Sequence, residues 1–508
     1  MSATLATVGA LSTLSLVAPR QARAMDAEVT SDTAAQFYDV RSPTGETVLA
    51  RRRLTTTLGV GAYDLIDRPL DKPMGPELSF RARVRYDADY GASGSESDAT
   101  NYGRLVPGFS RGPVDLMYGY VEGRRFLSGW LGFKLGRQYV VDSLGWWSFD
   151  GGQARVTTPF FVAAEAYGGL EVRGGMPLST PRFEREGVWR GDRTGYDPAL
   201  YPSFQPATIA PAFGAAIEST GLTWLHGRLS YRRVYNTGKS NVTEFAGGLV
   251  APTLYDGSRI SQERLGYSID ANLSEIGGVK AGIAYDLYLA RVTSMYASVD
   301  GYVGKRLTLS LDYDFFQPSF DADSIWNFFA GEPMNDFGVR AAFDATEKLS
   351  VAGGAHARMF TVQTSAYNPD SANNSPNFRA SDPRSYYPSN GVAFDEGANL
   401  STRYRFGQGS VGVRGNGNFG DGGDRVGADV FGERLFETRY VASARASLWQ
   451  WNDKLRPDRD ATSFGYVGGI GYIFAPRSRA LIEWEHNMNR LVGHRFRLML
   501  WLTVAVTK

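Results

Sequence analysis

Arginine and lysine side chains recur at every second position in several segments of this sequence. In the stretch 78–90, Arg81, Arg83 and Arg85 alternate with apolar residues. Side chains two residues apart share one face of a β-strand, so these guanidinium groups form a row of positive charge. On the wall of a passage such a row concentrates anions, and arginine binds carboxylate or phosphate in bidentate fashion.

The same alternation predicts a set of basic side chains that line a passage and contact its solute. The set consists of Arg81, Arg83, Arg85, Lys134, Arg228, Lys280, Arg358, Arg403, Arg405, Arg414, Arg445, Arg495 and Arg497. Trp224 shares the parity of Arg228 and is added as a residue that either stacks on a sugar ring or packs in an aromatic girdle. For each basic residue the alternative role is an ion pair with a carboxylate on a neighbouring strand.

The sequence offers little for catalysis or for metal binding. The four histidines, at positions 226, 356, 486 and 494, lack metal-ligand spacing, and there is no cysteine. The G-x-S-x-G, H-E-x-x-H and P-loop motifs are absent. A net charge of +1 argues against a nucleic-acid partner. We therefore predict that the chain is not an enzyme and that it holds no cofactor or metal.

Long strands must position the basic rows. In the stretch 276–317, Val279, Ala281 and Ile283 alternate with more polar residues such as Lys280. These runs last roughly 11 residues, whereas strands of soluble proteins average about 5–6 and a tilted strand that crosses a bilayer needs about 9–11. Mean hydropathy is −0.27, as expected when the interior and loops of a barrel are polar. Beyond the N-terminus no apolar run is long enough for a membrane helix.

The pattern predicts an all-β fold, a single transmembrane antiparallel up-and-down barrel over residues 54–508. Short turns alternate with long Gly/Ser/Pro-rich connections, as in outer-membrane barrels with short periplasmic turns and long outer loops. We expect about 18 strands, within a range of 16–20, and an interior wide enough for an aqueous channel. A secreted β-solenoid or sandwich is the alternative fold.

The N-terminal residues predict export. Residues 1–24 resemble a secretory signal peptide, with an apolar stretch from Leu5 to Val17 and an Ala22-Arg23-Ala24 cleavage site. Residues 25–53 are polar and are expected to form a short periplasmic extension, far too short for a plug domain. Together with the strands, this predicts the outer membrane of a Gram-negative bacterium.

Two short motifs carry a resemblance to known proteins. Leu135 to Gln138 reads L-G-R-Q, and Phe149 to Gly151 reads F-D-G. Over about residues 130–175 this resembles porin-type barrels, including the alginate-export-like group. The resemblance implies a conducting barrel for carbohydrates or similar polar solutes. Arg137 shares parity with apolar residues, so either it lies at a strand end near lipid headgroups or a bulge resets the register.

Three functional hypotheses follow. The first is a passive channel for polar solutes, acting as an export conduit for an acidic exopolysaccharide with periplasmic export proteins as partners. The second is a general or sugar-selective diffusion porin, favoured by a constricting loop folded inside the barrel. The third is a non-conducting surface or adhesive barrel, favoured by an interior packed shut by its own Arg–Asp pairs. In each case outer-membrane lipid surrounds the barrel and nucleic acid is not a partner.

Overall fold

The computed structural model describes the chain in ten stretches, almost entirely as antiparallel strands. These stretches are 26–66, 75–89, 114–172, 210–237, 240–243, 252–255, 257–319, 333–361, 392–454 and 459–507. Within them, no helix is long and apolar enough to cross a membrane.

Twenty-two strands form one sheet, and two short strands form a separate hairpin. The strands of the large sheet are β1 (Asp26–Arg41), β2 (Thr47–Tyr63), β3 (Glu77–Asp89), β4 (Val114–Phe126), β5 (Leu131–Asp142), β6 (Gly145–Thr157), β7 (Val162–Glu171), β8 (Pro211–Ser219), β9 (Leu225–Asn236), β12 (Arg259–Leu273), β13 (Gly277–Asp286), β14 (Arg291–Val303), β15 (Leu307–Phe316), β16 (Met334–Asp344), β17 (Leu349–Thr361), β18 (Val392–Phe406), β19 (Gly409–Gly420), β20 (Gly423–Phe436), β21 (Tyr440–Asn452), β22 (Ala461–Ala475), β23 (Ser478–Asn489) and β24 (Gly493–Thr507). The hairpin consists of β10 (Ser240–Thr243) and β11 (Pro252–Tyr255).

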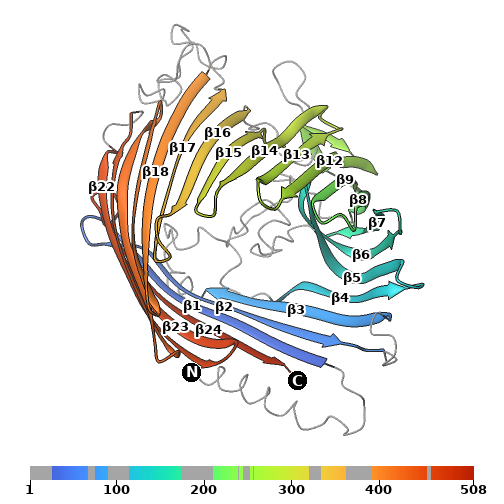
Figure 1. Ribbon diagram of the computed structural model, residues 1–508, viewed down its shortest axis with the longest axis horizontal. Helices are drawn as coiled ribbons and strands as arrows, with labels where there is room; N and C mark the ends of the chain where they lie inside the picture. The colour runs from blue at the N-terminus through green and yellow to red at the C-terminus, as the bar shows by residue number, and fades with distance from the viewer. Residues whose placement is uncertain are drawn as a thin grey trace.

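The sheet closes on itself as a barrel. Each strand pairs with the strands before and after it, and β1 pairs with both β2 and β24. The closing seam runs from Glu28 opposite Thr507 to Arg41 opposite His494. Figure 1 shows β1 and β24 side by side, with the strands arranged as a ring around a central space. Closure leaves no exposed sheet edge, the condition for a β-sheet in lipid.

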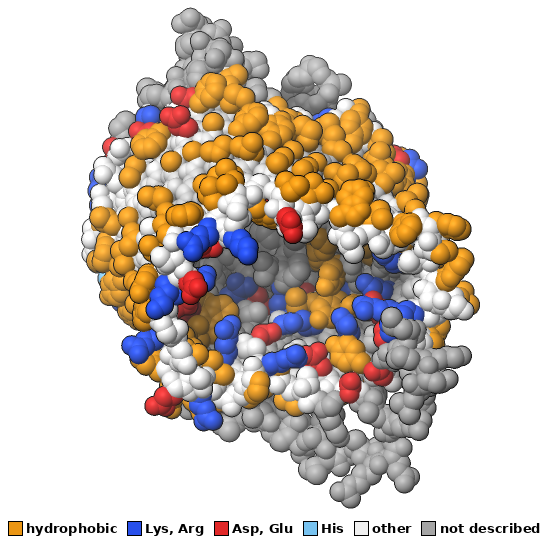
Figure 2. Space-filling view, in the orientation of Figure 1, with side chains coloured by type: hydrophobic (Ala, Val, Ile, Leu, Met, Phe, Trp, Pro, Cys, Tyr) orange, Lys and Arg blue, Asp and Glu red, His pale blue; other side chains and the backbone are white. Residues whose placement is uncertain are grey.

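The two faces of the wall differ as the sequence alternation predicts. On β13, Val279 and Ile283 point outward and are 42% and 37% exposed, whereas Ala284 and Asp286 point inward and are buried. Figure 2 shows apolar side chains over the outer surface and basic and acidic side chains on the inner wall. The outer apolar face is the one that lipid covers in a transmembrane barrel.

Connections alternate in length between the two ends of the barrel. At one end, every connection from the β4–β5 turn onward is a turn of two to five residues. The start of β1 and the end of β24 lie at the same end. The other end carries the long connections 90–113, 172–210, 237–258, 317–333 and 362–391, together with short turns such as 287–290 and 421–422. By the rule for outer-membrane barrels, the end with short turns is periplasmic and the end with long connections faces outward.

The predicted strand number was wrong, although the fold class is confirmed. The barrel has 22 strands, not about 18. Its first described strand begins at Asp26, and residues 26–53 form β1, a turn and part of β2, in place of the expected periplasmic extension. The outer row of β1 includes Ser31 and Thr33, and the Thr33 hydroxyl donates to Thr56 Oγ1 on β2 at 3.3 Å. Such small polar residues hide the alternation from a hydropathy reading. The predicted signal peptide, 1–24, lies outside the described residues.

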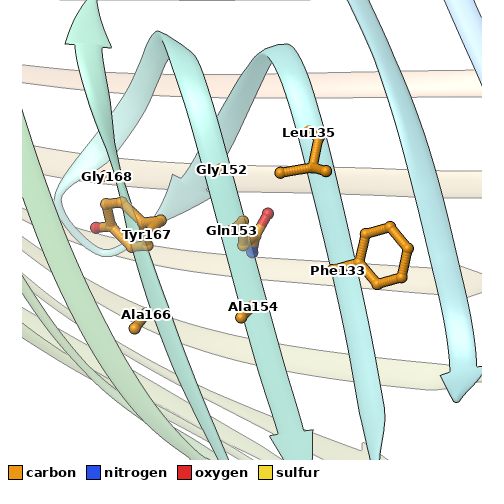
Figure 3. A pocket seen from close by; sticks show the side chains of 8 residues that line it. All are labelled: Phe133, Leu135, Gly152, Gln153, Ala154, Ala166, Tyr167 and Gly168. Carbon is orange, nitrogen blue, oxygen red and sulfur yellow. The ribbon is translucent and has the colours of Figure 1, made fainter.

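A shallow groove of about 370 Å³ crosses the outer face over β5, β6 and β7. Figure 3 shows its lining, where Leu135 and Phe133 border the small residues Gly152 and Gly168. The groove exists because these glycines and the nearby Ala154 and Ala166 have little or no side chain on the outer face. It lies on the lipid side of the wall and therefore plays no part in lining the interior.

Candidate functional site: an inward hairpin and the charged inner wall

The hairpin of β5 and β6 extends beyond the strands that flank it. Pairing of β4 with β5 stops at Gly119 opposite Arg137, and pairing of β6 with β7 begins at Phe149 opposite Glu171. Within the described residues, 138–147 form backbone pairs only with each other, up to Asp142 opposite Gly145, and Ser148 O accepts from Val172 N at 3.0 Å. In the part of the chain that the structure describes, no strand of the wall continues the sheet on either side of residues 138–147.

This part of the hairpin folds into the barrel. The rings of Trp147 and Phe149 stack with centroids 4.4 Å apart, and Phe149 is fully buried. They pack in one cluster with Tyr167 and Val234, which lie on the inner row of β7 and β9. Trp147 Nε1 donates to Glu171 Oε1 at 2.9 Å. Apolar side chains thus hold the hairpin against the inner wall.

The tip of the hairpin reaches farther, to β12. The backbone oxygen of Leu144 accepts a hydrogen bond from Arg232 Nη2 on β9 at 3.0 Å. Gly266 on β12 lies directly beneath the tip, because a Cβ built there would overlap Ser143 Oγ and the Leu144 side chain. A cavity of about 270 Å³ lies between the tip and the inner wall of β12 to β15, next to Arg264. The tip therefore crosses the inner face of β7, β8 and β9 and occupies part of the interior.

Glycines allow the hairpin to leave the wall. Gly136 has φ +126°, a region that favours glycine. A Cβ on Gly136 would overlap the Gly119 carbonyl oxygen, and one on Gly151 would overlap the Gly168 carbonyl oxygen. Gly136 pairs with Gly151 in the register of the hairpin. The G-R-Q and F-D-G motifs therefore face each other at the base of the inward hairpin.

Arg137 stays on the outer row and is neutralised there. Its Nε and Nη2 donate to the two carboxylate oxygens of Asp150 at 2.7 and 2.8 Å, and its Nη1 donates to Leu116 O at 3.0 Å. The pairing of β5 with β6 shows no register shift. Of the two expectations for Arg137, the bulge between these strands is wrong. The residue lies where β5 leaves its pairing with β4.

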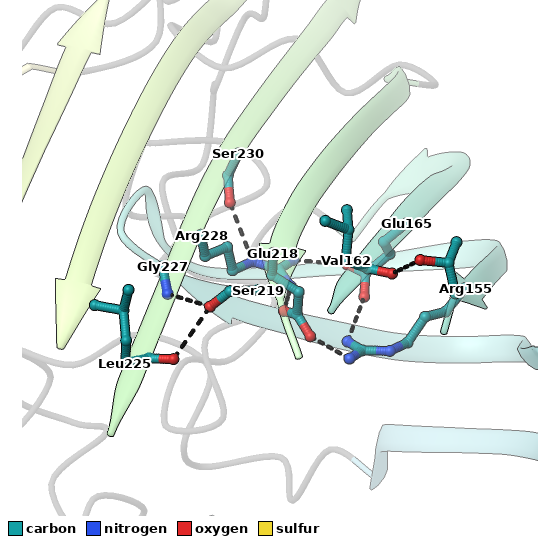
Figure 4. Close-up of polar contacts among 10 residues, drawn as sticks. Arg155, Val162, Glu165, Glu218, Ser219, Leu225, Gly227, Arg228 and Ser230 are labelled. Atoms are coloured by element: carbon teal, nitrogen blue, oxygen red, sulfur yellow. Dashed lines mark hydrogen bonds and ion pairs between the residues drawn. The ribbon is translucent and has the colours of Figure 1, made fainter. Parts of the chain in front are cut away.

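Four charges on the inner row of neighbouring strands form a compact cluster (Figure 4). Arg228 Nη1 donates to Glu218 Oε2 and Nη2 donates to Glu165 Oε1, both at 2.7 Å. Arg155 pairs with Glu218 as well, and with Glu165 at 3.9 Å. Two arginines and two glutamates cancel in net charge, and each charge has an opposite neighbour.

The basic row of β3 is also matched by carboxylates. Arg83 pairs with Asp32 on β1 at 2.5 Å, and Arg85 pairs with Asp115 on β4 at 3.3 Å. Arg85 is only 4% exposed. A buried guanidinium is stable only when a nearby charge and hydrogen bonds replace its water. The alternation therefore predicts correctly that these arginines lie on the inner face. However, Arg83 and Arg85 are each paired with a carboxylate.

The other predicted basic residues lie on strands of the barrel, and most of them have a carboxylate partner. These pairs are Lys134 with Glu122 at 3.9 Å, Lys280 with Asp270 at 3.8 Å, Arg358 with Asp336 at 2.6 Å, Arg403 with Glu433 at 2.5 Å, Arg445 with Asp429 at 3.0 Å, Arg495 with Glu485 at 2.9 Å, and Arg497 with the same Glu485.

Three predicted cations differ from the rest. Within the described residues, Arg81, Arg405 and Arg414 form no ion pair with a carboxylate. Arg81 instead lies over the Tyr63 ring, 5.1 Å from its centroid. Trp224 precedes β9 in a short turn and is 51% exposed, so it lies at the barrel end and not within the wall.

The sequence analysis did not select several residues that shape the interior. Arg155 and Glu218 belong to the charged cluster, and Trp147 and Phe149 hold the inward hairpin. One signal was present: Trp147 and Phe149 share the inner parity with Arg155, and large aromatics are unexpected on a row that faces water. Such a break in alternation indicates an element packed inside.

The ion pairs line the wall and do not bridge it. Each ion pair between described residues joins groups on one strand, on neighbouring strands or on strands one apart, including the turns beside them. The longest of these steps, such as Arg403 on β18 to Glu433 on β20, crosses a single intervening strand. In the described ranges, no group of three or more His, Asp or Glu residues is placed to hold a metal ion.

Comparisons with known proteins give likeness only at the level of solved structures. No family model and no curated protein matches the chain. OpdK of Pseudomonas aeruginosa, solved with vanillate, is 9% identical with a TM-score of 0.39, covering 95% of this chain and 99% of that one. OccAB4 of Acinetobacter baumannii is 8% identical, TM-score 0.42, covering 97% and 100%. A BenF-like porin from Pseudomonas fluorescens Pf-5 is 9% identical, TM-score 0.43, covering 95% and 98%.

These TM-scores are below 0.5, and it is the geometry of this chain itself that indicates the fold and the membrane. Nothing in the comparisons shows the resemblance to the alginate-export-like group. The chain closes an antiparallel sheet of long strands, exposes apolar side chains on the outside and keeps most of its charges on the inner wall, while outward charges such as Arg137 are paired. Those are the properties of the barrels that span the outer membrane of Gram-negative bacteria. The protein is an outer-membrane β-barrel.

Proposed function

We propose that the protein is a porin, a passive channel that lets small polar solutes cross the outer membrane. The observation that carries this proposal is the inward β5–β6 hairpin within a closed barrel whose inner wall is charged. The diameter of a barrel grows with strand number, and barrels of about 16–18 strands already hold an aqueous channel. In a barrel of 22 strands, one hairpin narrows the passage and leaves a route beside it.

The inward hairpin favours a diffusion porin over an export conduit for an acidic exopolysaccharide. A long polymer needs an unobstructed passage, whereas a constriction selects small solutes. The placement of the ion pairs along the wall also argues against an interior packed shut by its own Arg–Asp pairs. The export conduit and its periplasmic partner proteins have no further support.

We propose a modest preference for anionic solutes. Most of the predicted basic residues are neutralised by carboxylates, so the wall as a whole is not strongly positive. Arg81, Arg405 and Arg414 remain available to attract an anion, because no carboxylate within the described residues pairs with them. Cations that line a low-dielectric passage raise the local concentration of anions.

Liposome swelling tests the channel proposal. Vesicles that contain the refolded protein are diluted into iso-osmotic sugars of increasing size. We expect rapid swelling with monosaccharides and a steep fall for longer oligosaccharides, because the hairpin sets a size limit. Swelling that does not depend on sugar size would indicate a conduit without a constriction. No swelling with any sugar, from vesicles that contain folded barrel, would contradict the proposal.

A further inference from the structure

We infer that Arg232 is the positioning residue that holds the tip of the β5–β6 hairpin against the inner wall and so sets the width of the channel. This inference rests on the proposed channel function. It concerns the tip, residues 142–145, and its contacts with β9 and β12. The apolar cluster at the base of the hairpin holds Trp147 and Phe149, but the tip lies beyond that cluster and needs a separate contact.

Arg232 is the group that provides this contact. Its side chain extends inward from β9 and is only 2% exposed. Nη2 donates to the backbone oxygen of Leu144 at 3.0 Å, and the guanidinium carbon lies 5.4 Å from the centroid of the Trp147 ring. The Arg232 side chain therefore contacts both Leu144 at the tip and Trp147, between the tip and the base of the hairpin.

The hydrogen bonding of Arg232 is incomplete, which points to a positioning role. Nε and Nη1 are buried and have no hydrogen-bond partner among the described residues. No carboxylate within the described residues forms an ion pair with this guanidinium. Burying a donor without a hydrogen-bond partner is unfavourable, and more so when the group is charged. The buried guanidinium therefore makes its described contacts with Leu144 and Trp147 and not with a described carboxylate.

The shape of the wall beneath the tip agrees with a specific docking position. Gly266 leaves room for Ser143 and Leu144, since any larger residue would overlap them. Leu144 is 6% exposed. The cavity of about 270 Å³ beside Ser143 and Arg264 gives the tip free space on one side. The tip therefore contacts the wall at Arg232 and Gly266 and borders a cavity on the side of Arg264.

The first test is Arg232→Met, which keeps an unbranched apolar stem over Trp147 and removes the hydrogen bond to Leu144. The matched control is Arg233→Met, because Arg233 is the next residue, faces outward and pairs with Glu263 at 3.2 Å. Single channels are recorded in planar bilayers. We expect Arg232→Met to raise the mean conductance about twofold and to increase current noise, since the narrowest cross-section governs ion flow. Arg233→Met should behave as wild type.

A disulfide provides the second test. The chain has no cysteine, so the double variant Ser143→Cys with Gly266→Cys contains one pair only. A side chain at position 266 displaces Leu144, so the reference is the same cysteine pair in the otherwise wild-type protein. Added to Arg232→Met, the oxidised pair should give the conductance and low noise of the oxidised reference, and a reductant should separate the two proteins again. Arg232→Met with wild-type conductance and noise, folded and unaffected by oxidation of the pair, would overturn the inference.

Failure of the channel proposal can be recognised separately. The rate of disulfide formation, read from mobility on a gel, reports the position of the tip whether or not ions pass. If no variant conducts but Arg232→Met slows cross-linking severalfold relative to Arg233→Met, the positioning role stands and the channel proposal fails. If cross-linking is equally fast in both backgrounds, Arg232 does not position the tip.

Discussion

Arg137 and Asp150 face each other across the β5–β6 hairpin on the lipid-facing row, joined by two parallel hydrogen bonds of 2.7 and 2.8 Å. The pair lies where the hairpin leaves the wall. The positive charge of Arg137, which would be unfavourable beside lipid, is therefore neutralised there by Asp150. The L-G-R-Q and F-D-G motifs thus supply the two halves of one ion pair, together with the glycines that allow the bend.

Breaking this pair should destabilise the barrel. Asp150→Asn leaves Arg137 as an unpaired charge on the outer row, where a cation costs about 2–4 kcal/mol at mid-membrane and about 0–1 near the interface. We expect a loss of about 1–2 kcal/mol in urea unfolding from lipid vesicles, between those limits. Arg137→Met combined with Asp150→Leu should recover most of it, because neither charge then remains. A double variant as unstable as the sum of the single variants would contradict this account.

The charged cluster around Glu218 should govern part of the ion selectivity. Glu218→Gln leaves Arg155 and Arg228 with one carboxylate, so the cluster gains a net positive charge. We expect the reversal potential in a salt gradient to shift toward anion selectivity by about twofold in permeability ratio. Arg155→Gln should shift it the other way. Glu263→Gln is the control, because Glu263 faces outward, and an equal shift there would exclude a local effect of the interior.

The aromatic cluster should be required for a rigid hairpin. Phe149 is fully buried and stacks on Trp147 at 4.4 Å, so Phe149→Ala removes a packed ring and costs about 3–5 kcal/mol of local stability. We expect new protease cleavage within residues 138–148 of the folded barrel. Phe160→Ala, at a residue 79% exposed in a short turn, should leave the cleavage pattern unchanged. Resistance of both variants would show that the cluster does not hold the hairpin.

The close approach of β6 and β7 should tolerate no side chain at Gly151. A Cβ there overlaps the Gly168 carbonyl oxygen, whereas one at Gly468 on β22 meets nothing within 4 Å. Overpacking of this kind costs about 1–3 kcal/mol. We expect Gly151→Ala to lower the urea midpoint and the folded fraction on a gel, and Gly468→Ala to leave both as in wild type. Equal behaviour of the two variants would argue against the tight packing.

The sequence predicts the wall well, because the alternation of side chains decides which face each residue takes. Arg83 and Arg358 lie on the inner row as the period of two requires. Their partners were less predictable. Asp32 meets Arg83 across an intervening strand, and β1 was not recognised as a strand. Ion pairing depends on register and closure, which a local pattern does not contain.

The inward hairpin could not be predicted in the same way. Residues 138–148 keep the strand period, so nothing local distinguishes them from a strand in the wall. What differs is that no described strand pairs with residues 138–147 on either side, together with glycines at the base and aromatics at inner positions. The three-dimensional pairing shows the difference. β4 and β7 stop pairing before the tip, and the tip lies against Arg232 and Gly266.

Single-channel recording of the refolded protein in a planar bilayer tests the central claim most directly. A charged inner wall narrowed by one hairpin predicts discrete conductance steps, a modest anion preference in a salt gradient, and a larger conductance in Arg232→Met than in Arg233→Met. Folded barrels that insert but carry no current, with or without the hairpin contact at Arg232, would contradict the account of the protein as a channel.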